Sequence, residues 1–407
     1  MELLMPPTLG KPRLATLSFD RKFLYCIAGF FVLVVLVLPY FTINTYVIGL
    51  GIQGLIYVLL ALGLNVVVGY AGLLDLGYVA FYAVGAYTSG ILTTKFGWQM
   101  WQAVPAVILA CIVAGIVIGG PTLRLRSDYL AIVTLGFGEI IRITAQNLEI
   151  TGGPSGIFGI PTWSFGDWSF NDGLSLPAWS IPAFFLVVGA LIGASLYAMK
   201  KQVAAIVTGS VAVLTAVIMA VLSGSLTNTI TFSSKVILYY FTAIIVLVLG
   251  LVGIPRLAQG KLGRAWKATR DDEDAAEAMG INTYAAKITA YIIGAVWAGI
   301  AGQLNATYIS SIAPGTFQFL QSALVLMAVV IGGMGSIPGV VVGGLFIFLA
   351  PELLRDVWDN RYFAFGILLL IVMIFRPKGL WPATSVLPWS RDRRAKDKLP
   401  SANEVTA

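Results

Sequence analysis

The apolar run FLYCIAGFFVLVVLVLPYFTI, residues 23–43, decides the fold class of this chain. A helix of this length crosses a hydrocarbon core that is about 30 Å thick. Four further apolar runs are long enough to cross: 47–68, 181–199, 203–222 and 236–254. Only 11% of the 407 residues are charged, whereas a soluble domain carries about 25% charged residues. The sequence therefore predicts an all-α polytopic membrane protein.

The run 23–43 could be mistaken for a secretory signal peptide. Its apolar region is longer than the roughly 7–15 residues typical of such peptides, and no A-x-A-like cleavage site follows it. We therefore interpret it as a retained first span.

The distribution of Lys and Arg predicts the topology, because these residues accumulate on the cytoplasmic side. They place 1–22 there as a cytoplasmic N-terminal segment, together with the loop 255–287 and the tail 383–407, which is expected to be disordered. The segment 147–180 contains no Lys or Arg and is expected to be an external loop. Between the ends, 23–382 is expected to form one transmembrane domain of about 10–12 membrane segments. This topology accounts for the net charge of +7, which is therefore no sign of nucleic-acid binding.

Two apolar segments are interrupted by Gly-rich breaks: LNVVVGYAGLLDLGYVAFYAVGAY (64–87) and LVLMAVVIGGMGSIPGVVVGGLFIF (324–348). They lie in opposite halves of the chain and form a weak internal repeat. Paired broken segments favour a transport pathway, because freed backbone groups and half-helix ends can face a polar substrate. The alternative is close helix packing through small residues, which we favour for the glycines taken singly.

Two carboxylates lie within apolar sequence. Asp75 is the only charged residue between Lys22 and Lys95. It can contact a substrate ammonium group or act as a gate, or it can cap the helix after the break, which we favour. Glu139 and Arg142 are three residues apart and are expected to form a structural ion pair. The candidate residues of the pathway are Gly72, Asp75, Gly77, Glu139, Gly332, Gly333, Gly335 and Ser336.

The sequence contains no pattern that indicates an enzyme. G-x-S-x-G, HExxH and Cys/His metal spacings are absent, and there is no histidine. The segment PRLAQGKLG (255–263) only partly matches a phosphate-binding loop, because Pro255 replaces a Gly and Leu262 replaces the Ser or Thr. We therefore expect no catalytic residue, no metal site and no cofactor bound by this chain. If ATP drives its transport, a separate polypeptide must use the ATP.

One short charged stretch, GRAWKATRDDEDAAEAMGIN (263–282), interrupts the apolar sequence. Residues 271–279 are expected to form a helix, because acids crowd its first turn and Gly280 suits its C-terminal end. Its alanines leave little bulk, so the helix could lie in a partner's groove. Arg264, Lys267 and Arg270 could then meet acidic groups of that partner. The alternative is an ordinary solvated loop helix.

Five motifs follow one another along the chain: GYAGLLDLGYVAFYAVGAYT (69–88), LRLRSDYLAIVTLGFGEIIR (123–142), TGGPSGI (151–157), the charged stretch 263–282 and GGMGSIPG (332–339). In this order they resemble branched-chain amino acid ABC transporter permeases of the LivM type. Asp274-Ala275-Ala276-x-x-x-Gly280 is similar to the Glu-Ala-Ala-x-x-x-Gly coupling pattern of such permeases, with Asp for Glu. The resemblance runs from about residue 45 to 382, with little recognisable motif in 160–235.

The resemblance implies a permease subunit of an ATP-driven importer in the bacterial cytoplasmic (inner) membrane. Its partners would be a second permease of the LivH type, two cytoplasmic ATPase subunits and an extracytoplasmic substrate-binding protein. Leu, Ile and Val would cross by alternating access, with both chain termini in the cytoplasm. The predicted ATPase-coupling residues are Arg264, Arg270, Asp274, Ala275, Ala276, Glu277 and Gly280.

Two alternatives remain open at this point. Permeases for urea, amides or other amino acids use similar membrane subunits. A stand-alone secondary transporter would instead use Asp75 or Glu139 as its ion-coupling carboxylate.

Overall fold

The structure is a computed structural model of the full chain. It describes seven stretches of residues and seven single positions between them. The predicted spans 23–43, 181–199 and 203–222 lie outside the described residues apart from some of those single positions, as do the N-terminal segment and the tail. The described residues are 45–123, 127–165, 168–170, 174–177, 229–232, 235–353 and 379–381, with 186, 190, 213, 366, 367, 370 and 374.

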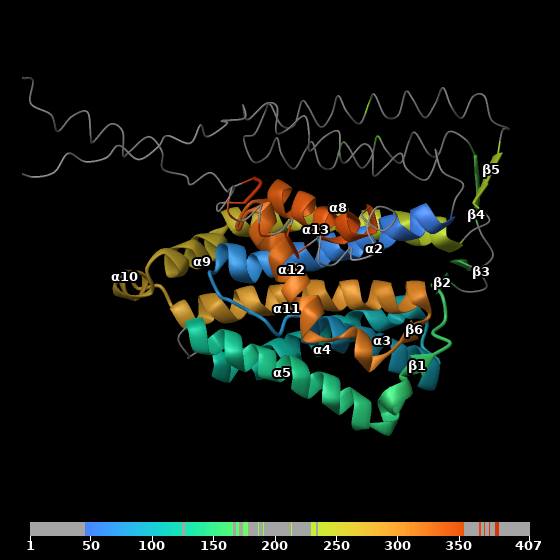
Figure 1. The fold of residues 1–407 in the computed structure, drawn as a ribbon, viewed down its shortest axis with the longest axis horizontal. Helices are drawn as coiled ribbons and strands as arrows, with labels where there is room; N and C mark the ends of the chain where they lie inside the picture. The colour runs from blue at the N-terminus through green and yellow to red at the C-terminus, as the bar shows by residue number, and fades with distance from the viewer. Residues whose placement is uncertain are drawn as a thin grey trace, which may run out of the picture.

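Long apolar helices run side by side and form the body of the molecule (Figure 1). Within the described residues, five helical segments are long and apolar enough to cross a membrane. This confirms the predicted all-α polytopic class. The five segments are Tyr46–Tyr70, Met100–Thr122, Lys235–Gln259, Thr283–Ile309 and Pro314–Gly332.

These segments and their neighbours make up eight α-helices of the body within the described stretches. A π-helical turn, η1 (Asn65–Tyr70), continues the first of them. The eight are α2 (Thr45–Leu64), α3 (Val79–Lys95), α4 (Met100–Thr122), α5 (Ser127–Asn147), α8 (Lys235–Gln259), α11 (Thr283–Ile309), α12 (Phe319–Gly332) and α13 (Ile337–Leu353).

Helix α11 lies at the centre and packs against α2, α3 and α4. The glycines of α11 allow this close packing, because a Cβ at Gly299 or Gly302 would overlap atoms of the neighbouring helices. A Cβ built on Gly85 of α3 would lie 2.2 Å from the carbonyl oxygen of Gly299, and one on Gly302 would lie 2.2 Å from that of Tyr82. Small residues thus bring the backbones together, as is common between membrane helices.

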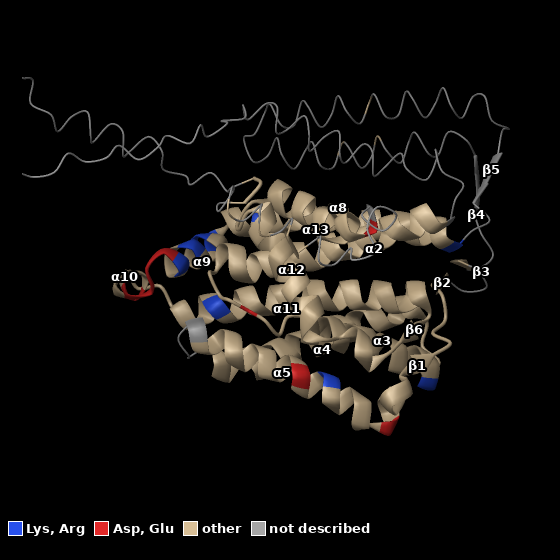
Figure 2. Ribbon diagram, viewed as in Figure 1, with Lys and Arg blue, Asp and Glu red and all other residues tan. Residues whose placement is uncertain are grey.

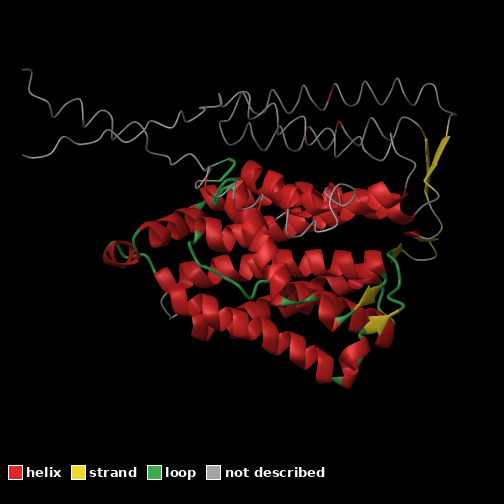
Figure 3. Cartoon of the chain, viewed as in Figure 1, coloured by secondary structure: helices red, strands yellow, loops and turns green. Residues whose placement is uncertain are grey.

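The two ends of the bundle differ in structure. At one end, α9 (Lys261–Asp271) and α10 (Glu273–Ala278) project beyond the other helices (Figure 1). The short strands gather at the opposite end (Figure 3). The strands pair antiparallel: β1 (Ile157–Phe158) with β6 (Ser311–Ile312), β2 (Ser164–Phe165) with β3 (Trp168–Ser169), and β4 (Leu174–Pro177) with β5 (Thr229–Phe232).

These strands and the helix α9 were not predicted from the sequence. The pairing of β1 with β6 joins the segment after α5 to the segment after α11, with Ile157 opposite Ile312. Single turns of 3-10 helix accompany the strands at this end, among them η2 (Glu149–Thr151), η3 (Gly153–Ser155) and η5 (Pro314–Thr316).

Candidate translocation pathway and coupling loop

The first predicted break is present. The π-helix η1 ends at Tyr70, the backbone is non-helical over 71–78, and α3 begins at Val79. The chain is thus helical before the break, up to Tyr70, and after it, from Val79 to Lys95. Gly72 has a φ of +74°, and a Cβ on Gly77 would lie 1.9 Å from the carbonyl oxygen of Thr134 on α5. Both positions require glycine, one for its backbone angle and one for its lack of a side chain.

The second break separates α12 from α13, as predicted. Helix α12 ends at Gly332, and Gly333 and Gly335 have φ values of +116° and +80°. Ser336 then caps the next helix, because its Oγ accepts a hydrogen bond from the backbone N–H of Gly339 at 3.3 Å. The glycines therefore serve the break itself as well as close packing.

The two breaks meet in space. The side-chain Oδ1 of Asn65, in η1, accepts a hydrogen bond from the N–H of Gly335 at 2.8 Å. The N–H of Val79, which starts α3, donates to Oγ of Ser322 on α12 at 3.1 Å. Asn65 and Ser322 were missed by the sequence analysis. A polar residue inside an apolar helix was the available signal in each case.

Asp75 lies in the first break and is completely buried. Its Oδ1 accepts a hydrogen bond from the N–H of Gly77 at 2.8 Å, an Asx-type turn within the break. The helix α3 is capped by Ser322 instead, so the expected helix-capping role of Asp75 is corrected to a turn-forming one. Thr134 and Tyr291 supply polar neighbours, while Oδ2 has no hydrogen-bond partner in the described part of the chain.

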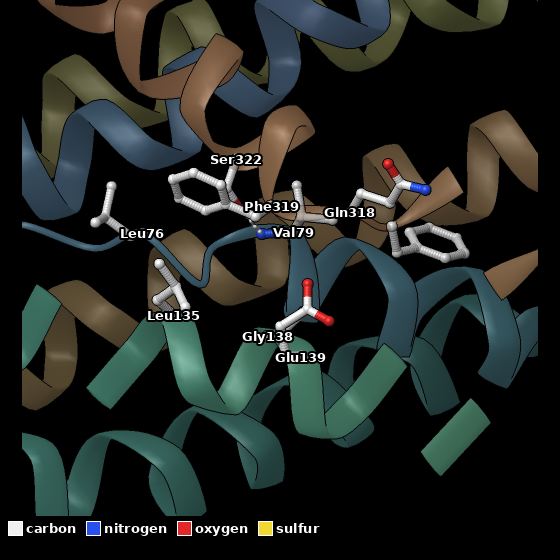
Figure 4. Close-up of a pocket in the computed structure, with 10 residues that line it drawn as sticks. Leu76, Val79, Leu135, Gly138, Glu139, Gln318, Phe319 and Ser322 are labelled. Atoms are coloured by element: carbon white, nitrogen blue, oxygen red, sulfur yellow. Dashed lines mark hydrogen bonds between the residues drawn. The ribbon is translucent and has the colours of Figure 1, made fainter. Parts of the chain in front are cut away.

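Glu139 and Arg142 form the predicted ion pair, with 2.7 Å between Arg142 Nε and Glu139 Oε2. Glu139 also lines a recess where α5 passes the first break and the start of α12 (Figure 4). Of the predicted pathway residues in the described chain, this recess includes only Glu139. It is lined by Leu76, Val79, Ala80, Leu135, Gly138, Glu139, Phe317, Gln318, Phe319 and Ser322.

The predicted short helix of the charged stretch is α10, and both of its ends are capped. Asp272 is the N-cap, and its carboxylate accepts from the N–H of Ala275 at 3.0 Å. At the other end, Gly280 has a φ of +80°. The N–H groups of Gly280 and Ile281 donate to the carbonyls of Glu277 and Ala276, at 2.8 and 3.0 Å. This is a Schellman motif, so Gly280 ends the helix as predicted.

Helix α10 is anchored to the start of α11 through side chains. Glu273 forms an ion pair with Lys287, and Glu277 accepts a hydrogen bond from Thr283 at 2.6 Å. Within α9, Trp266 is completely buried, and its indole N–H donates to Thr289 of α11 at 3.1 Å. The loop is therefore a folded unit that is fixed to the membrane helices.

The exposed side of α10 differs from the side that was expected to meet a partner. Ala276 is buried against this chain, so it does not belong to the outer surface. Asp274, Ala275 and Ala278 are exposed, and Met279 is 83% exposed at the tip. Figure 2 shows acidic residues around α10 and basic residues along α9.

The basic residues of α9 contact this chain. The Nη1 of Arg270 donates to the carbonyl oxygen of Gly69, at the end of η1, and Lys267 lies 5.7 Å from the ring centre of Tyr70. Arg264 donates to the carbonyl of Gln259 at 3.1 Å. Arg270 was expected to face a partner, but a cation is also favourable at a helix C-terminus, where carbonyls lack partners. It therefore connects the charged loop to the first break.

Comparison with known proteins shows the family of the chain. The family described as "Branched-chain amino acid transport system / permease component" matches residues 46–188 and 168–376. The chain belongs to this permease family. It is a multi-pass membrane permease of a multi-subunit transport system.

One relative of this permease is LivM of Escherichia coli, the permease protein of a high-affinity branched-chain amino acid transport system. The two chains are 39% identical over 331 residues, which cover 81% of this chain and 68% of LivM. BraD of Pseudomonas aeruginosa, from a system with the same description, is 27% identical over 80% of this chain and 92% of its own length. LivH of Escherichia coli is 32% identical over 123 residues, or 30% of this chain and 39% of LivH. No solved structure matches the chain.

Proposed function

We propose that this permease is one of two membrane subunits of an ATP-driven importer for Leu, Ile and Val in the bacterial cytoplasmic membrane. Two separate ATPase subunits use the ATP, and this chain binds no cofactor. An extracytoplasmic binding protein delivers the substrate to the end that carries the strands. The α10 end and both chain termini then lie in the cytoplasm.

The observation that carries this proposal is the construction of α10. A six-residue helix is too short to be stable alone, yet this one is capped at both ends and held by the Glu273–Lys287 pair. Its exposed side presents small residues and Met279 beyond the end of the bundle. An exposed helix of this kind fits a groove of a partner protein. A carrier without an ATPase would have no use for it.

The contact of Arg270 with Gly69 suggests how ATPase movement reaches the pathway. Helices α9 and α10 form one unit, because α9 ends at Asp271 and Asp272 caps α10. A shift of α10 therefore moves Arg270, which holds the end of η1. Asn65 in η1 is bonded to Gly335, so both breaks move with it. This linkage offers a physical basis for alternating access.

The experiment is uptake by purified components in liposomes. This chain, the second permease and the ATPases are reconstituted together, with ATP inside the vesicles and leucine-loaded binding protein outside. We expect leucine uptake that requires ATP and every component. Omitting the ATPases while imposing a proton or sodium gradient is the matched control.

Two results would contradict the proposal. Gradient-driven uptake by this chain alone would make it a secondary transporter. ATP-dependent uptake of urea or amides, with none of Leu, Ile or Val, would keep the importer class and replace the substrate.

A further inference from the structure

The second break is crossed by a segment that comes from much later in the chain. The N–H groups of Leu380 and Trp381 donate to the carbonyl oxygens of Ile331 and Gly332, at 2.6 and 3.0 Å. Both carbonyls belong to the last turn of α12. We call residues 379–381 the strap. No role for the strap was predicted from the sequence.

The strap contacts both sides of the break. A Cβ built on Gly379 would lie 2.6 Å from the Cα of Gly333, which directly follows α12. A Cβ built on Gly339, in the first turn of α13, would lie 2.8 Å from the carbonyl oxygen of Trp381. The backbones of the strap and the break therefore lie directly against each other. A change in the angle between α12 and α13 must disrupt at least one of these contacts.

The two carbonyls are available to the strap because their usual helical donors are used elsewhere. In a continuous α-helix, the N–H of Gly335 would donate to the carbonyl of Ile331. Here that N–H donates to Oδ1 of Asn65 instead. The N–H of Ser336, the helical donor for Gly332, also bonds elsewhere within the break. A buried carbonyl without a partner is costly, so the strap supplies the donors that the break has removed.

Asn65 and Leu380 thus compete with the same helical hydrogen bond. Asn65 binds its donor, the N–H of Gly335. Leu380 binds its acceptor, the carbonyl of Ile331. If η1 moved and withdrew Asn65, the N–H of Gly335 could return to Ile331, and α12 would continue into the break. Gly333 and Gly335 permit this change, because glycine adopts helical and left-handed angles about equally readily.

We propose that the strap is a latch of the permease, which holds the second break in the present conformation and is released by an exchange of hydrogen-bond partners at Ile331. In the latched state, Leu380 donates to Ile331 and Asn65 accepts from Gly335. In the released state, Gly335 donates to Ile331 and Leu380 leaves α12. Movement of η1 selects the state. This inference rests on the proposed function, and it adds the strap to the segments that movement of α10 must reach.

The first experiment joins the strap covalently to α12. Ile331→Cys and Leu380→Cys are introduced into a chain whose two native cysteines are replaced by alanine. Their backbones are hydrogen-bonded, which places the Cα atoms within the separation that a disulfide allows. Oxidation, or a short bis-methanethiosulfonate linker, then joins the two side chains in the assembled transporter.

We expect the joined transporter to lose leucine uptake by about tenfold or more, because the released state is no longer accessible. A thiol reductant should restore the uptake. Each single cysteine variant is the matched control and should transport equally with and without the joining reagent. Uptake that is unchanged after complete joining would show that the strap never leaves α12, and it would overturn the proposal.

The second experiment removes the latch by truncation. One chain ends after Pro382 and keeps the strap, while the other ends after Lys378 and lacks it. We expect the longer chain to transport like the wild type. The shorter chain should lose about tenfold in leucine uptake per ATP hydrolysed, because the released state is then favoured throughout the cycle. Equal uptake per ATP by the two chains would contradict the latch. If the shorter chain does not assemble, the joined variant decides.

Hydrogen–deuterium exchange of the two purified chains in detergent tests the latch without transport. In the shorter chain we expect slower exchange over 333–336, because α12 extends through these residues. A strap that only supports the break would give the opposite result, with faster exchange once it is removed, and that would overturn the proposal. Failure of the wild-type transporter to take up leucine with ATP would instead reject the proposed function and leave the exchange result in place.

Discussion

Asn65 and Gly335 are 270 positions apart in sequence, and they are joined by a hydrogen bond of 2.8 Å. The bond links the π-helix before the first break to the middle of the second break. It ties together the two places where the membrane helices are interrupted. Each break alone exposes backbone groups that need partners in an apolar environment, and here one break supplies a partner for the other.

Replacing Asn65 with Leu should destabilise the permease. Leu has a similar size but cannot accept the hydrogen bond, so the N–H of Gly335 loses its partner. We expect a loss of about 1–3 kcal/mol in the free energy of unfolding, measured by denaturation of the purified chain in detergent. Asn65→Asp, which keeps an acceptor oxygen, serves as the comparison. Unchanged stability of the Leu variant would mean that the bond contributes nothing.

Replacing Arg270 with Met should uncouple the transporter. The variant keeps the apolar stem but cannot donate to Gly69, so movement of α10 would no longer reach η1. We expect the ATPases to co-purify and to hydrolyse ATP, while leucine uptake per ATP falls about tenfold, which corresponds to a coupling free energy of about 1.4 kcal/mol.

The matched control for this variant is Lys261→Met, on the same helix. Lys261 is exposed in the first turn of α9, so uptake should stay near the wild-type level. If the two variants show the same leucine uptake per ATP, Arg270 does not transmit movement from α10 to η1.

Gly72→Ala should reduce transport more than Gly97→Ala, although both glycines have a positive φ. Gly72 has a φ of +74°, and an added Cβ would lie 2.7 Å from Cγ of Arg270. Gly97 has a φ of +68° but has nothing within 4 Å of such a Cβ. The left-handed conformation costs each variant about 1–2 kcal/mol.

Both variants bear the same backbone cost, so a difference in their transport activity reports on the contact between the added Cβ and Arg270. We expect only Gly72→Ala to reduce uptake per ATP in the reconstituted transporter. If both variants transport equally well, the packing of Arg270 on Gly72 has no functional role.

The two sides of α10 should respond differently to a bulky charge. Ala278→Arg places the guanidinium on the exposed side, so the helix should fold while the ATPases no longer co-purify. Ala276→Arg puts the same group at a position that is only 4% exposed, so the loop itself should be disrupted. Limited proteolysis in detergent separates the outcomes, with faster cleavage near 271–281 expected only for Ala276→Arg. ATPase binding by Ala278→Arg would contradict the assigned docking surface.

The fold class, both breaks and the short capped helix of this protein follow from local sequence. The length and character of the apolar runs determined that it is a helical membrane protein, because chain in lipid must satisfy its own backbone hydrogen bonds. The glycines predicted both breaks, since Gly72, Gly333 and Gly335 adopt angles that other residues avoid. Short-range chemistry likewise predicted the helix before Gly280 and the Glu139–Arg142 pair, whose partners are only three residues apart.

The tertiary structure decided which distant groups meet. Nothing in the sequence near Asn65 points to Gly335, and nothing near Arg270 points to Gly69, because these contacts depend on how helices pack across the bundle. The same holds for Ala276, which looks like its neighbours Ala275 and Ala278 in sequence but faces inward on α10. Local propensity determines elements and caps, whereas contacts between elements depend on packing that periodicity and composition do not encode.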